Sequence, residues 1–119
     1  FDAEERLEIV KNALFKDLKM SKKKIILISF KSLTTTLCKK YKSNIILRGL
    51  RAVSDFEYEV QLASMNRSLS PAIESVFMSP AEKYSFLSSS IIKDIARHHG
   101  NIDGFVHQAV ATALKNKFE

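Results

Sequence analysis

The sequence has few of the features that mark secreted, membrane-spanning or metal-cluster proteins. Its one cysteine, Cys38, can form neither an internal disulfide nor a zinc cluster, so we expect a reducing compartment and a cytoplasmic protein. No apolar run approaches the roughly 20 residues that cross a bilayer, and no basic-then-apolar leader opens the chain, so we expect no membrane partner. Glycine (3) and proline (2) are also scarce, and this favours one compact, helix-rich unit over residues 1–119.

Positive charge is present in excess, but it is unevenly distributed. The 119 residues carry a formal charge of +6, and the whole excess lies in residues 1–42, where all basic residues except Arg6 are lysines. We interpret this part as a solvated lysine-rich surface, or alternatively as a patch that steers a small polyanion. No helix shows an arginine-rich face, so we expect no nucleic acid partner.

Hydrophobic periodicity divides the chain into alternating helices and strands. Short apolar, β-branched runs predict buried strands at 24–29, 44–48 and 74–78, and helical spacing predicts helices at 3–19, 32–41, 54–69, 91–99 and 106–118. Asp2 with Glu5, and Ser54 with Glu57, have the spacing of capping boxes. Gly100 stands where a left-handed helix cap is expected. In the helix at 54–69, the residues expected to face inward are Phe56, Val60, Ala63 and Met65.

This alternation predicts the α/β class, with a doubly wound parallel sheet and flanking helices. In such sheets ligands bind beyond the carboxyl ends of the strands. The candidate site therefore lies in the residues that follow the three predicted strands.

Two arginines lie at the end of the second predicted strand and just after it. Arg48 and Arg51 flank Gly49, and guanidinium forks suit phosphate oxygens, while glycine lets a ligand approach the main chain. The alternative is an ordinary ion pair with Asp55 or Glu57.

A serine run follows the third predicted strand. Ser88, Ser89 and Ser90 lead directly into a helix, whose free N–H groups attract anions, although a single serine that caps the helix would also fit. Asp55 and Glu59 share one helix face, either as favourable acids near a helix start or as contacts to ribose hydroxyls or a base amino group.

Other polar residues favour structural interpretations. His98 and His99 point to different helix faces and do not form a chelating pair, so we expect them to stabilise a helix end. Cys38 lies in an apolar pattern and is expected to fill the core.

The chain resembles the bacterial phosphopantetheine adenylyltransferases. The resemblance rests on R-G-L-R-A-V-S-D-F-E-Y-E at 48–59, on Y-S-F-L-S-S-S at 84–90 and on F-D-A-E-E-R at 1–6. It implies a Rossmann-like nucleotidyltransferase fold and adenylyl transfer from ATP to 4′-phosphopantetheine, with Mg²⁺, in a homo-oligomer that is typically a hexamer.

The resemblance also implies roles for individual residues. Arg48 would hold the phosphate of phosphopantetheine, and Leu33 and Thr34 would line its pantetheine arm. Lys93 would assist with the nucleotide. The residues implied for ATP binding are Gly49, Leu50, Arg51, Glu59, Tyr84, Ser85, Phe86, Leu87, Ser88, Ser89 and Ser90.

One family feature does not occur in residues 1–119. The G-x-F-D-P-x-x-x-G-H turn, whose histidine stabilises charge at the reacting phosphate, has no counterpart here, so no catalytic residue is assigned. We expect the chain to be the remnant of a longer domain that lacks about 40–45 residues at its N-terminal side, and to be inactive alone. The alternatives are a different small-molecule adenylyltransferase and a non-catalytic module that binds nucleotide or RNA.

Overall fold

In the computed structural model, all 119 residues are described except for the side chains of residues 53 and 54. The chain forms two compact units. Residues 30–86 make up the first, called here the β-unit, and residues 1–29 and 87–119 make up the second, called here the helical unit. Among the described residues, no helix is both long and apolar enough to cross a lipid bilayer.

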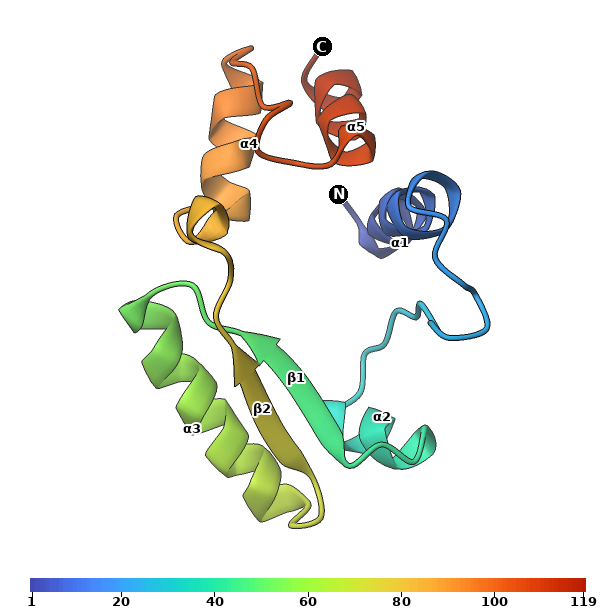
Figure 1. The fold of residues 1–119 in the computed structure, drawn as a ribbon, viewed down its shortest axis with the longest axis vertical. Helices are drawn as coiled ribbons and strands as arrows, with labels where there is room; N and C mark the ends of the chain where they lie inside the picture. Colours follow the sequence, from blue (N-terminus) through green and yellow to red (C-terminus); the bar gives the residue numbers. More distant parts are fainter. The chain divides into compact units, whose positions relative to one another are not determined.

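The β-unit is built on two parallel strands and the helix that connects them. Strands β1 (Ile45–Gly49) and β2 (Glu74–Met78) pair in parallel, with Leu47 opposite Val76. Helix α3 (Val53–Leu69) connects the two strands and packs along them (Figure 1). The short helix α2 (Thr34–Lys40) precedes β1, and a 3₁₀ turn, η2 (Glu82–Tyr84), follows β2. A parallel sheet with flanking helices confirms the predicted α/β class, with two strands among the described residues.

The two faces of this sheet differ in what covers them. Side chains from alternate positions, including Arg48 and Phe77, meet α3 across a small cavity. On the other face Ile45 and Leu47 are each 61% exposed, and Met78 is exposed beside them. The prediction of a buried strand at 44–48 is therefore wrong about burial, because only one face of β1 is covered.

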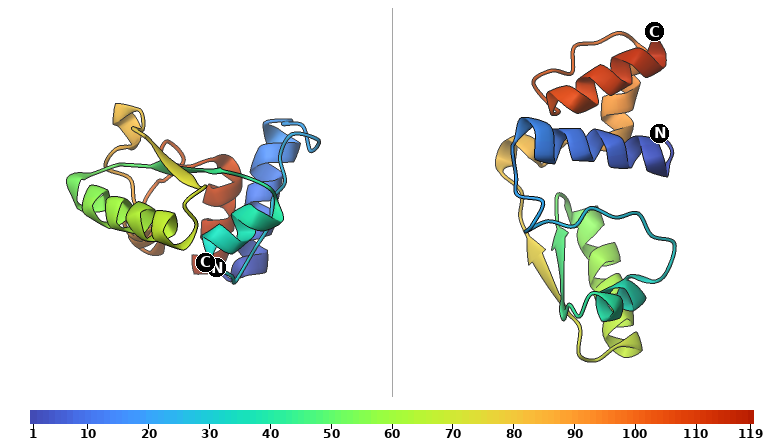
Figure 2. Two further views of the ribbon diagram at one scale, coloured as in Figure 1. Left: turned by 90° about the horizontal axis from the view of Figure 1, so that it is seen from below. Right: turned by 90° about the vertical axis from the view of Figure 1, so that its right-hand side faces the viewer.

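The helical unit has its own small hydrophobic core. It contains α1 (Ala3–Lys11), the π-helix η1 (Asn12–Asp17), α4 (Ser89–Arg97) and α5 (Gln108–Phe118). Helix α5 packs against α1 on one side and α4 on another (Figure 2). The core residues of this unit are Ile92, Ala96, Ile102, Ala111 and Leu114.

The start of α1 confirms the predicted capping box. The Glu5 N–H donates to Asp2 Oδ1 at 2.8 Å, and the Asp2 N–H donates to Glu5 Oε2 at 2.6 Å. The predicted box of Ser54 with Glu57 depends on the Ser54 side chain, which lies outside the described part of the chain. Burial of Cys38 confirms its prediction as core filler.

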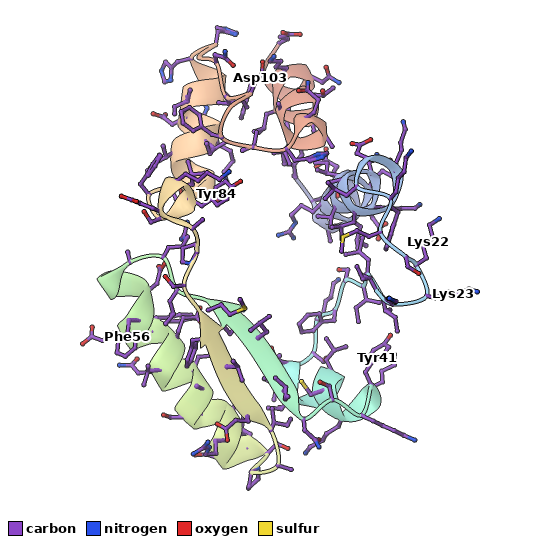
Figure 3. All side chains as sticks on the ribbon, in the orientation of Figure 1. Lys22, Lys23, Tyr41, Phe56, Tyr84 and Asp103 are labelled. Carbon is purple, nitrogen blue, oxygen red and sulfur yellow. The ribbon has the colours of Figure 1, made fainter. Side chains whose placement is uncertain are left out.

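A predicted strand is absent from the helical unit. Residues 24–29 have no regular secondary structure, although they are apolar and β-branched. A strand needs a hydrogen-bonded neighbour, and the described residues supply none to this segment. Lys22 and Lys23, which precede it, lie in an exposed turn, as expected of a solvated lysine-rich surface (Figure 3).

The inward face of α3 also differs from the prediction. Three of the residues predicted to face inward, Phe56, Val60 and Met65, are exposed. Glu59 and Asn66 are buried instead. The apolar pattern is misleading here because α3 faces strand positions that include Arg48, and the helix places a carboxylate opposite that guanidinium.

The end of α4 shifts the predicted left-handed cap by one residue. His99 has φ 59°, and Gly100 does not have a positive φ. The Gly100 N–H donates to the Ile95 carbonyl at 2.9 Å and the His99 N–H to the Ala96 carbonyl at 3.0 Å. These two bonds form a Schellman motif, in which the residue before Gly100 takes the left-handed conformation.

Candidate functional site

The arginine motif lies at the carboxyl end of the sheet. Arg48 and Gly49 are the last two residues of β1, and the Leu50 N–H donates to the Met78 carbonyl at the end of β2, at 2.9 Å. Both strand ends therefore meet at one edge, with Arg51 directly beyond it. A Cβ at Gly49 would meet no atom within 4 Å, so the space beside this residue is open.

Arg48 forms a two-pronged ion pair with Glu59 of α3. Its Nε and Nη2 donate to the two carboxylate oxygens, Oε2 and Oε1, at 2.8 and 2.7 Å. These hydrogen bonds hold the pKa of Glu59 below its ordinary range and raise the pKa of Arg48. The carboxylate side chain is 10% exposed and the guanidinium side chain 45% exposed, so the arginine is the outer member of the pair.

Arg51 pairs with a second acid on α3. Its Nε lies 3.3 Å from Asp55 Oδ2, which is the ion pair that the sequence left open as an alternative to phosphate binding. Asp55 and Glu59 are one helical turn apart, as predicted, and each contacts a different arginine. Both arginines are partly exposed, so an ion pair and an anion can share each guanidinium.

A cavity of about 20 Å³ adjoins the Arg48–Glu59 pair. A volume of this size holds about one water molecule. Thr34, at the start of α2, lines it together with Arg48, so the structure brings these two predicted site residues together. Leu33, one residue earlier, is 60% exposed.

The segment after β2 divides between the two units. Tyr84, Ser85 and Phe86 belong to the β-unit; Tyr84 is exposed beside Lys83, and the Ser85 hydroxyl donates to the Glu82 carbonyl at 2.7 Å. Leu87 and the serine run belong to the helical unit.

Ser88 caps α4 in the helical unit. Its hydroxyl oxygen accepts from the Ile91 N–H at 3.2 Å, which is the role of the single capping serine. Ser89 and Ser90 form the exposed first turn of α4. Leu87 packs against the core of this unit and thereby anchors the start of the helix.

Two comparisons with known proteins show which family the chain resembles. The family model described as cytidylyltransferase-like matches residues 1–95. A protein of Pelagibacter ubique (strain HTCC1062) named phosphopantetheine adenylyltransferase is 56% identical over 119 residues, which are 100% of this chain and 73% of that protein.

The chain belongs to the phosphopantetheine adenylyltransferase family of nucleotidyltransferases.

Asn66 also adjoins the site of this adenylyltransferase, and the sequence alone did not point to it. Asn66 lines the same cavity as Arg48 and Glu59, and it lies seven residues after Glu59, on the same helix face. The seven-residue spacing of Glu59 and Asn66 is the feature of the sequence that places them on one helix face. It does not predict burial, because polar residues at helical spacing usually face solvent.

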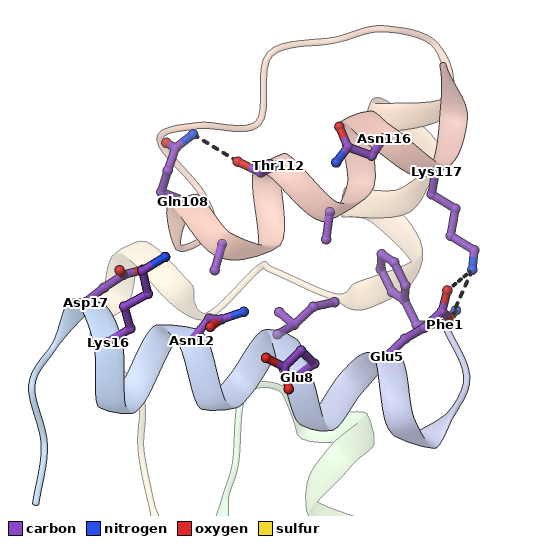
Figure 4. A pocket seen from close by; sticks show the side chains of 13 residues that line it. Phe1, Glu5, Glu8, Asn12, Lys16, Asp17, Gln108, Thr112, Asn116 and Lys117 are labelled. Carbon is purple, nitrogen blue, oxygen red and sulfur yellow. Dashed lines mark hydrogen bonds and ion pairs between the residues drawn. The ribbon is translucent and has the colours of Figure 1, made fainter.

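A cleft of about 760 Å³ lies within the helical unit, between α5 and the segment formed by α1 and η1 (Figure 4). An ion pair of Glu5 with Lys117, at 2.9 Å, closes one end. Among the described residues that line it, none belongs to the predicted substrate sites.

Proposed function

We propose that this protein transfers the adenylyl group of ATP to 4′-phosphopantetheine, a step of coenzyme A biosynthesis. A phosphate oxygen of phosphopantetheine attacks the α-phosphorus of ATP, the bond to the bridging oxygen of the β-phosphate breaks, and dephospho-coenzyme A and pyrophosphate form. The observation that carries this proposal is the 56% identity to an enzyme of that name over the whole chain.

The acceptor site is proposed around Arg48. Its exposed guanidinium suits the phosphate of phosphopantetheine, because a planar fork can donate two parallel hydrogen bonds to phosphate oxygens. Leu33 and Thr34 are proposed to line the pantetheine arm. In support, Thr34 shares a cavity with Arg48, and the exposed Leu33 side chain offers an apolar surface.

ATP contacts are proposed within each unit separately: at the end of the sheet in the β-unit, and at the start of α4 in the helical unit. Arg51 supplies a charged donor for ATP phosphates, and the main chain at Gly49 and Leu50 allows close approach. The first turn of α4 adds free N–H groups that favour anions. The family resemblance implies an ATP contact at Glu59 as well. The other proposed ATP contacts are Tyr84, Ser85, Phe86, Leu87, Ser88, Ser89 and Ser90, with Lys93 nearby in sequence.

For adenylyl transfer, these residues must position the two substrates and neutralise the charge of the phosphates. Nucleotidyl transfer depends on in-line alignment and on neutralising the phosphates, with little covalent chemistry for the protein. Arg48 and Arg51 carry out parts of both tasks. The family's G-H turn, whose histidine would stabilise the reacting phosphate, does not occur in residues 1–119.

Magnesium is proposed to enter with ATP. Among the described residues, no group of three or more His, Cys, Asp or Glu side chains could hold a metal ion. This donor set does not fit an all-protein metal site. Mg²⁺ characteristically binds through substrate phosphates and water, with few carboxylates.

We also propose that the protein works in the cytoplasm as a homo-oligomer. The family resemblance supports both statements, and the unpaired Cys38 agrees with a reducing compartment. Light scattering of the purified full-length protein gives its mass in solution. A mass several times that of one chain is expected, and a monomer would contradict the proposal.

Pyrophosphate release by the full-length protein tests the proposed function. ATP and Mg²⁺ are supplied with either 4′-phosphopantetheine or nicotinamide mononucleotide. We expect rapid release with phosphopantetheine and background release with the nucleotide acceptor. The reverse preference would identify a different adenylyltransferase, and no release with either would favour a non-catalytic module, an alternative that the comparisons do not favour.

A further inference from the structure

The Arg48–Glu59 pair assigns Glu59 a different role from the ATP contact implied by the family resemblance. We propose that Glu59 is a positioning residue that holds the Arg48 guanidinium for the phosphate of phosphopantetheine, so that its effect falls on the acceptor and not on ATP. This inference rests on the proposed function, which supplies the acceptor.

The geometry gives the pair an inner and an outer member. Glu59 projects from α3 with its side chain 10% exposed, whereas the Arg48 side chain at the strand end is 45% exposed. A ligand that reaches this edge of the sheet therefore meets the guanidinium, with the carboxylate behind it. A buried acid behind an exposed base can orient the base.

The hydrogen bonds fix the orientation of the guanidinium plane. Glu59 engages Nε and Nη2, which form one edge of the guanidinium, at 2.8 and 2.7 Å. A guanidinium has five N–H donors in a rigid fork, so binding one edge fixes the direction of the remaining donors. Those donors include both hydrogens of Nη1, which are suited to a phosphate oxygen.

The surroundings of Glu59 argue against a primary role with ribose. Both of its oxygens already accept charge-assisted hydrogen bonds, the stronger kind. Asn66 and Leu62 of α3 line the same cavity of about 20 Å³, which has room for about one water molecule and not for a sugar.

Steady-state kinetics of the full-length Glu59→Gln variant separate the two roles. The glutamine side chain has the same shape, but it has one acceptor oxygen and places an NH₂ group against an Arg48 donor. We expect the KM for phosphopantetheine to rise at least fivefold and the KM for ATP to change less than twofold. Calorimetric titration of phosphopantetheine without ATP should show the same loss of affinity.

Three comparison variants complete the test. Glu59→Asp keeps the charge and the two acceptor oxygens, so it should recover part of the affinity for phosphopantetheine. In an Arg48→Ala background, Glu59→Gln should cause no further loss, because the residue to be positioned is gone. Glu74→Gln removes an exposed ion pair with Arg67 in the same unit and should leave both KM values unchanged.

Each contrary outcome has a separate meaning. A rise in the KM for ATP alone would overturn the inference and make Glu59 an ATP contact. Equal rises in both KM values, together with a lower unfolding temperature, would also overturn it and assign a purely structural role. A wild-type enzyme that turns over only another acceptor would overturn the proposed function instead, and the binding titration would detect this independently.

Discussion

At the scale of single residues, the two arginines of the motif are only three positions apart, yet they have different partners. Arg48 pairs with Glu59, and Arg51 pairs with Asp55. The bond from Arg51 is longer, and both members of that pair are partly exposed. Arg51 is therefore better placed to exchange its acid for a phosphate than to serve only as a structural ion pair.

Arg51→Ala should weaken use of ATP by an order of magnitude or more. A hydrogen bond to a charged group contributes about 1.5–3 kcal/mol, which corresponds to roughly 10- to 150-fold in kcat/KM for ATP. Arg67→Ala, which removes another exposed arginine of the β-unit, serves as the control. Normal ATP kinetics for Arg51→Ala in the full-length enzyme would remove this residue from the ATP site.

The Arg48–Glu59 pair should also make stability depend on pH. Its hydrogen bonds hold the pKa of Glu59 below the ordinary value in the folded state. The pair therefore contributes fully above the pKa of the unfolded chain, and this contribution is lost as the pH falls through the lowered, folded-state pKa. Urea unfolding between pH 6 and pH 3 should show a smaller loss of stability for Glu59→Gln than for the wild type. Parallel curves would contradict this.

The sequence could predict the arginines of the site but not the way they are held. A guanidinium at a strand end is visible from periodicity alone. The pairing of Arg48 with Glu59 depends on which face of α3 packs on which face of β1. The apolar pattern predicted the wrong face of α3, because Phe56 and Met65 are exposed. The buried face of α3 is chosen in part by an ion pair, and periodicity does not record ion pairs.

At the scale of elements, partners decide which apolar segments become strands. Residues 24–29 and 44–48 have similar β-branched composition, but only the second lies beside another strand. Local propensity was enough for α1 and its capping box, because helix hydrogen bonds are internal to the segment. Strand formation needs a distant segment, so it is the less predictable of the two.

The end of α4 provides a test of backbone strain at one element. His99 has φ 59°, a conformation that costs a residue with a Cβ about 1–2 kcal/mol relative to glycine. After the greater flexibility of glycine in the unfolded chain is subtracted, His99→Gly should stabilise the protein by about 0.5–1 kcal/mol in urea unfolding. His98→Gly, one residue earlier and at φ −95°, is the control and should give no such gain.

Gly100→Ala should have the opposite effect at the same helix end. A Cβ at position 100 would lie 2.5 Å from Ile95 Cγ2 and 3.1 Å from the Ile95 carbonyl oxygen. The methyl group of Ile95 is attached directly to its Cβ, so it cannot move away without changing a rotamer or the backbone. We expect destabilisation of about 1–3 kcal/mol, the usual cost of overpacking. An unchanged urea midpoint would show that this helix end adapts freely.

At the scale of the whole molecule, the β-unit has fewer strands than a stable sheet usually needs. Its two strands leave Ile45 and Leu47 on a largely exposed face, and a sheet of only two strands is marginal in water. The relative from Pelagibacter ubique is longer, and this chain spans 73% of it. The exposure of this sheet face and the activity of the chain can be tested together.

A polypeptide of residues 1–119 alone should release no pyrophosphate from ATP and 4′-phosphopantetheine. Arg48 and Arg51 can bind phosphates, but the histidine of the family's G-H turn does not occur in these residues. The exposed sheet face should also make this polypeptide bind a hydrophobic dye more strongly than the longer relative from Pelagibacter ubique does, mole for mole. Intact mass spectrometry confirms which polypeptide is in each assay. Turnover by residues 1–119 within tenfold of that relative would mean that the G-H turn is not needed for catalysis.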